Sequence, residues 1–152
     1  MDKEPINLVL WDASHGCEAL SDRLGSLKYS KANGSIICFP IDDPDSLENV
    51  RERWMPEVTH FISTEAPIIL VGCKKDLRND PATLGRLDRR GKRPVTYEQG
   101  IASRDEIKGR AYLECSALTG EGVREVFLCA AEAAKRYEGL GRSKKAAGCI
   151  IT

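Results

Sequence analysis

Four short apolar stretches recur along the chain, and each has the length of a buried β-strand. They cover residues 6–11, 35–41, 67–73 and 111–115. The stretch at 67–73, PIILVGC, is the clearest, because β-branched and aliphatic residues fill it. Stretches that are apolar on both faces are typical of a parallel sheet with helices on each side. The sequence therefore predicts such a sheet.

Apolar residues at helical spacing fill the first interval between these strands. Asp43-Pro44 is a start signal, in which the carboxylate is expected to cap the helix and the proline to occupy its first turn. The apolar residues that follow recur at helical spacing as far as Phe61. Pro56 is expected to bend or interrupt this helix, because proline has no N–H to donate.

Two further helices are expected nearer the C-terminus. Thr96 is a suitable cap for a helix that runs to about Ile107, and residues 121–137 carry the clearest apolar stripe of the chain. Strands and helices therefore alternate, which predicts an α/β, doubly wound domain.

The remaining segments are polar. Residues 78–95 are charged and bounded by Gly and Pro, which predicts a surface insert with a short helix near 81–89. Residues 139–152 are rich in Gly, Ser, Lys and Ala, which predicts a flexible tail. The expected organisation is thus one domain over 1–138 followed by this tail.

Composition narrows the functional classes. The chain of 152 residues has 23 basic and 23 acidic residues, a balance that argues against a nucleic-acid binder driven by overall charge. The end of the chain is nevertheless basic, with one acid, Glu138, among five basic residues: Lys135, Arg136, Arg142, Lys144 and Lys145. Six cysteines without C-x-x-C spacing, no visible signal peptide and no apolar stretch of transmembrane length favour a reducing cytosolic setting.

A candidate binding loop follows the strand at 67–73. Ligands of doubly wound folds bind at the carboxyl ends of the strands, and Lys74-x-Asp76 falls at such an end. A carboxylate can accept two parallel hydrogen bonds from a planar N–H/N–H₂ edge, which guanine presents and adenine does not. An isolated K-x-D is more often a solvated loop. Here a second segment, LECSALTGEGVREVF at 113–127, places Ser116-Ala117 at the end of the next strand.

Together these two segments resemble the guanine-binding half of a small GTPase. The insert at 78–95 resembles the one that marks the Rho family, and further segments match the Rho pattern: LWD at 10–12, DPDSLENV at 43–50, RWMPEVTHF at 53–61 and PVTYEQG at 94–100. The chain is therefore identified as similar to the Rho family of the Ras superfamily, most of all to its fungal members. The resemblance implies a P-loop NTPase (Ras-like) fold, with a mostly parallel sheet that is truncated at its N-terminal side.

The guanine site implied by the resemblance comprises six residues: Cys73, Lys74, Asp76, Ser116, Ala117 and Leu118. Asp76 would grip the guanine edge, Lys74 would pack on the base, and Ala117 would offer its backbone N–H to the guanine oxygen. Ser116 would shape the loop. Leu118 replaces the usual lysine, which is expected to weaken base packing. The implied cofactors are GTP or GDP and magnesium.

The phosphate side departs from the family pattern. Asp12 resembles the aspartate that holds magnesium, but Cys17 stands where the family has the glutamine that orients the attacking water, so no catalytic residue is assigned. No G-x-x-x-x-G-K-[ST] motif occurs in the chain. The first strand, the P-loop and the first switch of the family have no counterpart. In the family's sheet that strand lies between those expected here at 6–11 and 35–41, so its loss would leave two unpaired edges.

The segment Cys149-Ile150-Ile151-Thr152 matches the prenylation pattern of a cysteine, two aliphatic residues and a final residue. A chance cysteine is the plain alternative. With the upstream basic residues, the pattern predicts lipidation at Cys149, by farnesyl rather than geranylgeranyl, and attachment to an anionic membrane surface. The expected location is the cytoplasmic face of the plasma membrane.

Three functions remain open from sequence. The first is a Rho-type GTP-binding switch with impaired or absent hydrolysis, whose partners are guanine nucleotide and Rho regulators and effectors. The second is a non-enzymatic, membrane-tethered interaction module that competes for those regulators. The third is a non-functional gene fragment.

Overall fold

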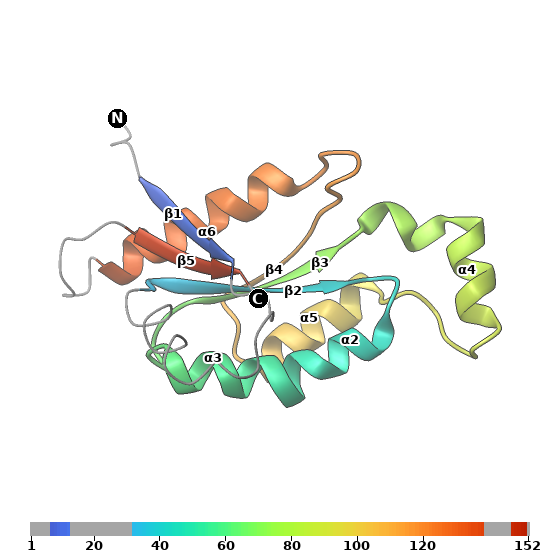
Figure 1. Ribbon diagram of the computed structural model, residues 1–152, viewed down its shortest axis with the longest axis horizontal. Helices are drawn as coiled ribbons and strands as arrows, with labels where there is room; N and C mark the ends of the chain where they lie inside the picture. The colour runs from blue at the N-terminus through green and yellow to red at the C-terminus, as the bar shows by residue number, and fades with distance from the viewer. Residues whose placement is uncertain (1–6, 13–31, 139–146, 152) are drawn as a thin grey trace.

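The computed structural model describes residues 7–12, 32–138 and 147–151. These residues form a five-stranded sheet of order β1-β5-β2-β3-β4, in which every pairing is parallel. Figure 1 shows the sheet edge-on, with α6 covering one face and α2, α3 and α5 covering the other. The strands are β1 (Leu8–Asp12), β2 (Gly34–Pro40), β3 (Ile68–Cys73), β4 (Ala111–Glu114) and β5 (Ala147–Ile151). The α/β, doubly wound prediction is confirmed.

The core lies on both faces of the sheet, because successive side chains of a strand point in opposite directions. On β2, Ile36 packs under α6 with Ile69 and Ala134, whereas Ile37 packs on the opposite face with Leu70. All five side chains are at most 2% exposed. Burial on both faces explains why these strands are continuous apolar runs rather than alternating ones.

The helix expected from residue 43 is continuous but changes its pitch. It consists of α2 (Pro44–Asn49), a π-helical turn at Val50–Trp54 and α3 (Met55–Phe61). The π turn ends two residues before Pro56, so the irregularity expected at the proline occurs as a change of pitch and not as a break in the helix.

The start of α2 differs from the prediction in one respect. Pro44 occupies the first turn as expected, but the Asp43 side chain makes no capping hydrogen bond. The Ser46 hydroxyl donates to the Asp43 carbonyl oxygen at 2.5 Å, which does not replace the cap, because a cap accepts from the first N–H groups of the helix.

The later helices match their sequence signals closely. The insert contains α4 (Pro81–Asp88), and α5 (Tyr97–Glu106) begins with the expected cap, because the Thr96 hydroxyl accepts from the Gln99 N–H and the Gln99 side chain accepts in return from the Thr96 N–H. The long helix is α6 (Val123–Glu138). No helix among the described residues is both long and apolar enough to cross a membrane.

The strand β5 departs from the predicted flexible tail at 139–152. Residues 147–151 lie between β1 and β2 (Figure 1), and Cys149 is in register with Leu10 on one side and Gly34 on the other. The physical reason is that both neighbouring strands would otherwise present unpaired N–H and C=O groups inside the molecule. Residues 139–146 and Thr152 lie outside the described residues.

Candidate functional site

The two loops singled out from the sequence lie side by side at the carboxyl edge of the sheet. The backbone N–H of Lys75, after β3, donates to the Cys115 carbonyl oxygen at 3.0 Å, which ties the K-x-D loop to the loop after β4. Lys74 adopts a left-handed conformation, with φ of 59°, before the 3₁₀ helix at Lys75–Asn79 begins. This turn places Asp76 in the first turn of that short helix.

Asp76 is held by Ser116. The Ser116 hydroxyl donates to Asp76 Oδ1 at 2.5 Å, and Ser116 itself is completely buried. A hydroxyl on one oxygen fixes the direction of the carboxylate and leaves further acceptor capacity on both oxygens. Asp76 is therefore an oriented hydrogen-bond acceptor, and its expected contact with the guanine edge stays a prediction.

Lys74 is anchored beside this carboxylate. Its Nζ lies 3.4 Å from Asp42 Oδ1 at the end of β2, and the Arg86 guanidinium of α4 donates to the other Asp42 oxygen at 2.8 Å. Asp42 is 8% exposed, whereas the Lys74 side chain is 56% exposed. The lysine thus has a fixed amine and an accessible aliphatic stem, which can lie against a base.

The loop that carries Ser116 is tightly closed. The Ser116 N–H donates to the Glu121 carbonyl oxygen at 2.9 Å, and the Ser116 hydroxyl accepts from the Thr119 N–H at 3.2 Å. Ala117 and Leu118 lie exposed at the tip, with Leu118 84% exposed. The exposed Ala117 lies at the surface beside the Asp76 loop, where the resemblance places a backbone donor to the guanine oxygen.

Gly122 is required for this closure. Its φ is +73°, and a Cβ placed on it would lie 2.2 Å from the Glu114 carbonyl oxygen. We expect Gly122→Ala to lower the free energy of unfolding by about 2 kcal/mol, because alanine meets both the strained φ and a backbone clash. Chemical denaturation measures the change.

The matched control is Gly85→Ala in the interior of α4. A Cβ there meets nothing within 4 Å, and its φ is not left-handed. Alanine should raise the free energy of unfolding by up to about 1 kcal/mol through helix propensity. Equal effects of the two substitutions would contradict this account of the loop.

An ion pair between Arg78 and the buried Glu114 side chain holds the K-x-D loop against β4. The Arg78 guanidinium donates to both oxygens of Glu114, at 2.7 and 2.6 Å, and the Tyr112 hydroxyl donates to one of them at 2.7 Å. Burial raises the pKa of the Glu114 carboxyl, but the bonds from Arg78 and Tyr112 outweigh it, so the pKa lies below its ordinary value. The charged pair therefore fixes the 3₁₀ helix to β4.

Cys73 lies at the end of β3, but its side chain packs with Cys38 and Cys115 under α6 rather than standing free in the loop. A hydrogen bond with Cys38 and burial raise the pKa of the Cys73 thiol, and burial raises the pKa of Cys115 to about 11. Thiols held in the neutral form behave as small apolar groups. Cys73 therefore contributes to this site mainly through its backbone.

Asp12 stands apart from the guanine loops. It is exposed at the carboxyl end of β1, in register with Ile151, and three strand spacings, roughly 14 Å, separate β1 from β3. Among the residues that the structure describes, no group of three or more His, Cys, Asp or Glu side chains is arranged to hold a metal ion. Cys17 lies outside the described residues. The magnesium role of Asp12 and the loss of the water-orienting residue at Cys17 therefore stay predictions.

Comparison with known proteins decides the family. A family described as the Ras family matches residues 1–136. The GTP-binding protein RHO1 of Saccharomyces cerevisiae is 51% identical over 144 residues, covering 95% of this chain and 66% of the relative. The GTP-binding protein rho5 of Schizosaccharomyces pombe is 44% identical over 154 residues, covering 99% and 76%. The chain belongs to the Ras family and, within it, to the Rho type.

The Rho-type chain spans from 66% to 76% of the length of these relatives. Its residues fit one part of the family's ligand. The oriented Asp76 carboxylate, the Lys74 stem and the Ala117 loop form a donor and acceptor set suited to a guanine base. The 152 residues contain no P-loop motif, so how the phosphate part is held stays untested.

Sequence reasoning missed the ion pairs that hold this Rho-type site in place. Asp42 bridges Lys74 and Arg86, and Glu114 binds Arg78, across separations of 32 to 44 residues. No periodic pattern links such distant positions. The available signal was chemical: an aspartate at the end of one buried strand and a glutamate within another each need a cationic partner.

Proposed function

We propose that the chain is a Rho-type GTP-binding protein that recognises guanine nucleotide through its base and hydrolyses little or no GTP by itself. The main supporting observation is the Asp76 carboxylate. The Ser116 hydroxyl orients it at the carboxyl edge of the sheet, where ligands of doubly wound folds bind. The relatives named above are called GTP-binding proteins, which supports the same ligand here. Its partners would be the regulators and effectors of Rho proteins.

The nucleotide supplies the phosphates and, with bound magnesium, the charge that a switch responds to. This chain's residues would bind and orient the base: Asp76 accepts from its N–H edge, and Lys74 covers its face. The low hydrolysis follows from the sequence, because a thiol at Cys17 cannot position water as an amide does. GTP turnover that Asp76→Ala abolishes would contradict this part of the proposal.

A thermal melt of the whole chain tests base recognition. GDP with magnesium at about a hundredfold over its dissociation constant should add roughly 2.7 kcal/mol, and thus raise Tm by about 5–10 °C. ADP, which lacks the N–H/N–H₂ edge, should leave Tm unchanged. A Tm shift with ADP as large as that with GDP would show that the site does not distinguish guanine from adenine.

A cooperative melt that GDP leaves unchanged would favour the second candidate, a non-enzymatic module that binds Rho regulators regardless of nucleotide. The observation in its favour is β5, which pairs with both β1 and β2 and completes the sheet without the family's first strand. A folded Rho-type surface can therefore exist without a phosphate cradle.

The proposed site of action is the cytoplasmic face of the plasma membrane, reached through a prenyl group on Cys149 and the basic residues before it. The sequence pattern at 149–152 and the basic residues after position 134 support this proposal. In the structure β5 holds Cys149 in register with Leu10 and Gly34. Lipid attachment therefore requires a chain in which this strand has left the sheet.

We expect the chain to fractionate with membranes in cells and Cys149→Ser to release it to the soluble fraction, because stable anchoring needs both the prenyl chain and the basic residues. Flotation of cell extracts measures the change, and Cys129→Ser on α6 is the matched control. A Cys149→Ser chain that remains with the membranes would rule out the lipid anchor.

A further inference from the structure

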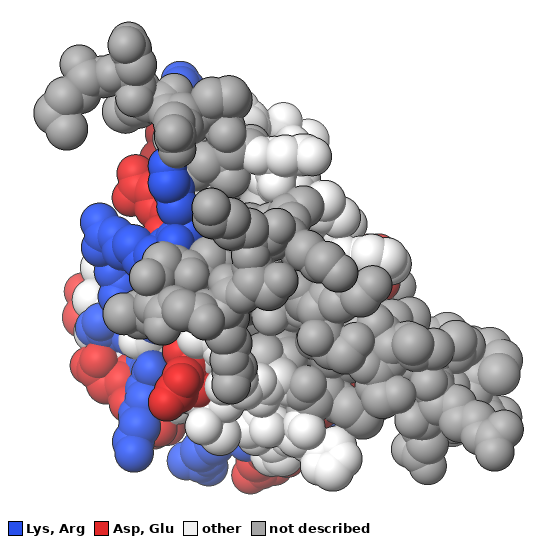
Figure 2. All heavy atoms as spheres, turned by 90° about the vertical axis from the view of Figure 1, so that its left-hand side faces the viewer, with Lys and Arg blue, Asp and Glu red and all other residues white. Residues whose placement is uncertain are grey.

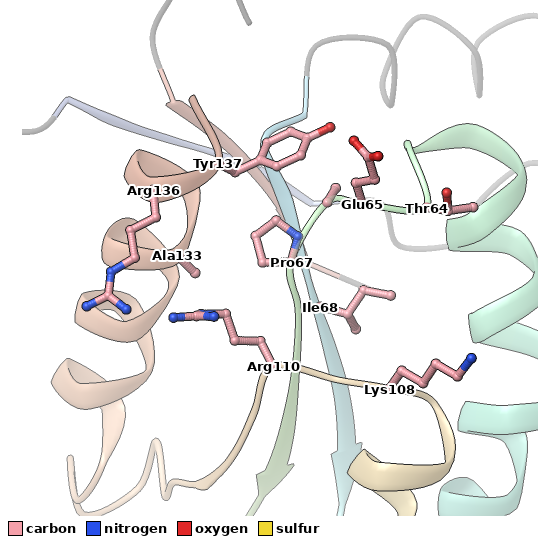
Figure 3. Close-up of a pocket in the computed structure, with 10 residues that line it drawn as sticks. Thr64, Glu65, Pro67, Ile68, Lys108, Arg110, Ala133, Arg136 and Tyr137 are labelled. Carbon is pink, nitrogen blue, oxygen red and sulfur yellow. The ribbon is translucent and has the colours of Figure 1, made fainter. Parts of the chain in front are cut away.

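A hollow lies at the edge of the sheet opposite the guanine loops, where β3 begins. Its volume is about 360 Å³, at the lower end of the range for small-molecule sites. Three segments line it: residues 64–68 before β3, the loop from Lys108 to Arg110 before β4, and the last turns of α6 with Arg136 and Tyr137. Figure 3 shows these residues around the hollow.

The lining is rich in unneutralised positive charge. Lys108, Arg110 and Arg136 are among its lining residues, against the single carboxylate of Glu65. Elsewhere in the described part of the chain most basic side chains form ion pairs, but none of these three has a described carboxylate within salt-bridge distance. Figure 2 shows this side of the molecule, where lysine and arginine side chains lie along one flank together with acidic ones.

Two of the cations form the centre of the site. Figure 3 shows the guanidinium groups of Arg110 and Arg136 turned toward the same space between α6 and the loop, whereas the Lys108 amine points away. An adjoining hollow of about 280 Å³ is lined by the same two arginines together with Glu132. Like charges in neighbouring positions repel, so an anion between them is favoured.

Both arginines come from fixed backbone. The Arg110 N–H donates to the Ile68 carbonyl oxygen at 2.7 Å, and the Gly109 N–H donates to the Arg104 carbonyl oxygen at 2.8 Å, so the loop is tied to β3 and α5. Arg136 is on α6, three residues after the buried Ala133. A planar guanidinium group can donate two parallel hydrogen bonds to the oxygens of a phosphate group, which a lysine ammonium group cannot do.

We propose that Arg110 and Arg136 form a binding site for a phosphomonoester, whose dianionic group lies between the two guanidinium groups while its carrier occupies the hollow beside Tyr137. Thr64 and Tyr137 supply hydroxyl groups along the lining, which suits a hydroxylated carrier. The site is separate from the guanine loops and does not depend on the function proposed above. The phosphomonoester can come from a soluble sugar phosphate or from a phosphatidic acid headgroup.

The test titrates the full chain with glucose 6-phosphate, with glucose, and with vesicles of phosphatidylcholine containing phosphatidic acid. We expect saturable binding of the phosphate ester or of the phosphatidic acid vesicles, and none of glucose. Arg110→Ala and Arg136→Ala should each weaken that binding at least about tenfold, because each removes a charge-assisted contact to the phosphate group. Binding of the soluble ester identifies a metabolite site, and binding of the vesicles alone identifies a lipid site.

The matched control is Arg124→Ala, an exposed arginine on the same helix that does not line the hollow. It makes the same change in net charge and should leave affinity within about twofold. Arg136→Lys keeps the charge but removes the fork, so it should weaken binding severalfold. Thermal melts without ligand confirm that each variant folds. Equal losses in Arg124→Ala and Arg110→Ala, or no binding of either probe at millimolar phosphate, would overturn the proposal.

Discussion

Asp76→Asn should reverse the base preference of this chain from guanine to xanthine. In the proposed site the carboxylate would accept from the N–H and N–H₂ groups of guanine, so losing it should weaken GDP binding by at least about 100-fold. Xanthine carries an oxygen where guanine carries the N–H₂ group. An asparagine amide can donate to that oxygen and still accept from the ring N–H, so XDP should bind better than GDP.

The substitution keeps the shape of the site, which makes the result interpretable. The Ser116 hydroxyl, now 2.5 Å from Asp76 Oδ1, can donate equally to an amide oxygen. Thermal shift and calorimetry with GDP, XDP and ADP measure the preference. Asp88→Asn is the control, because Asp88 is an exposed acid of α4 that pairs only with Arg93 at 3.3 Å among described residues. If both variants bind GDP like the parent chain, Asp76 does not read the base.

Ile150→Pro should destabilise the fold by about 3 kcal/mol or more. Ile150 lies within β5, in register with Trp11 on β1 and Ser35 on β2. Proline removes a ladder N–H and is found essentially only on edge strands, whereas β5 has a neighbour on both sides. The two neighbouring strands would regain unpaired edges if β5 were displaced.

Urea unfolding of the purified chain measures this effect. Thr152→Pro is the control, because it introduces the same residue immediately after the strand. We expect the control to change the free energy of unfolding by less than about 0.5 kcal/mol. An unfolding midpoint that is the same for Ile150→Pro and Thr152→Pro would mean that β5 does not contribute to the stability of the sheet.

The elements that were predicted correctly are those whose structure is determined by residues close together in the sequence. The buried strand at β3 is bounded within one residue of its expected limits, and Thr96 caps α5 as expected. Lys74, Asp76 and Ser116 were likewise found from their places after apolar runs. In each case a short window contains the residues that determine the structure.

The strand β5 could not be predicted in this way. Its sequence, AGCII, begins with two residues of low strand propensity and follows a segment with the composition of a tail. Its conformation is determined by the open edges of β1 and β2, which no local window contains. The Asp42 and Glu114 ion pairs were missed for the same reason, because their partners lie in other elements.

The position of β5 also determines how the molecule can assemble. Leu8 pairs with Ala147, so joining β1 to the rest of the sheet requires contacts across nearly the whole chain. Contacts of such sequence separation carry a large loop-closure entropy and are formed slowly. During synthesis β2, β3 and β4 can pair as soon as they emerge, but β1 must wait for a strand that is made after all of them. The newly made chain therefore passes through a period with two open sheet edges, in which it depends on chaperones or on dilution to avoid aggregation.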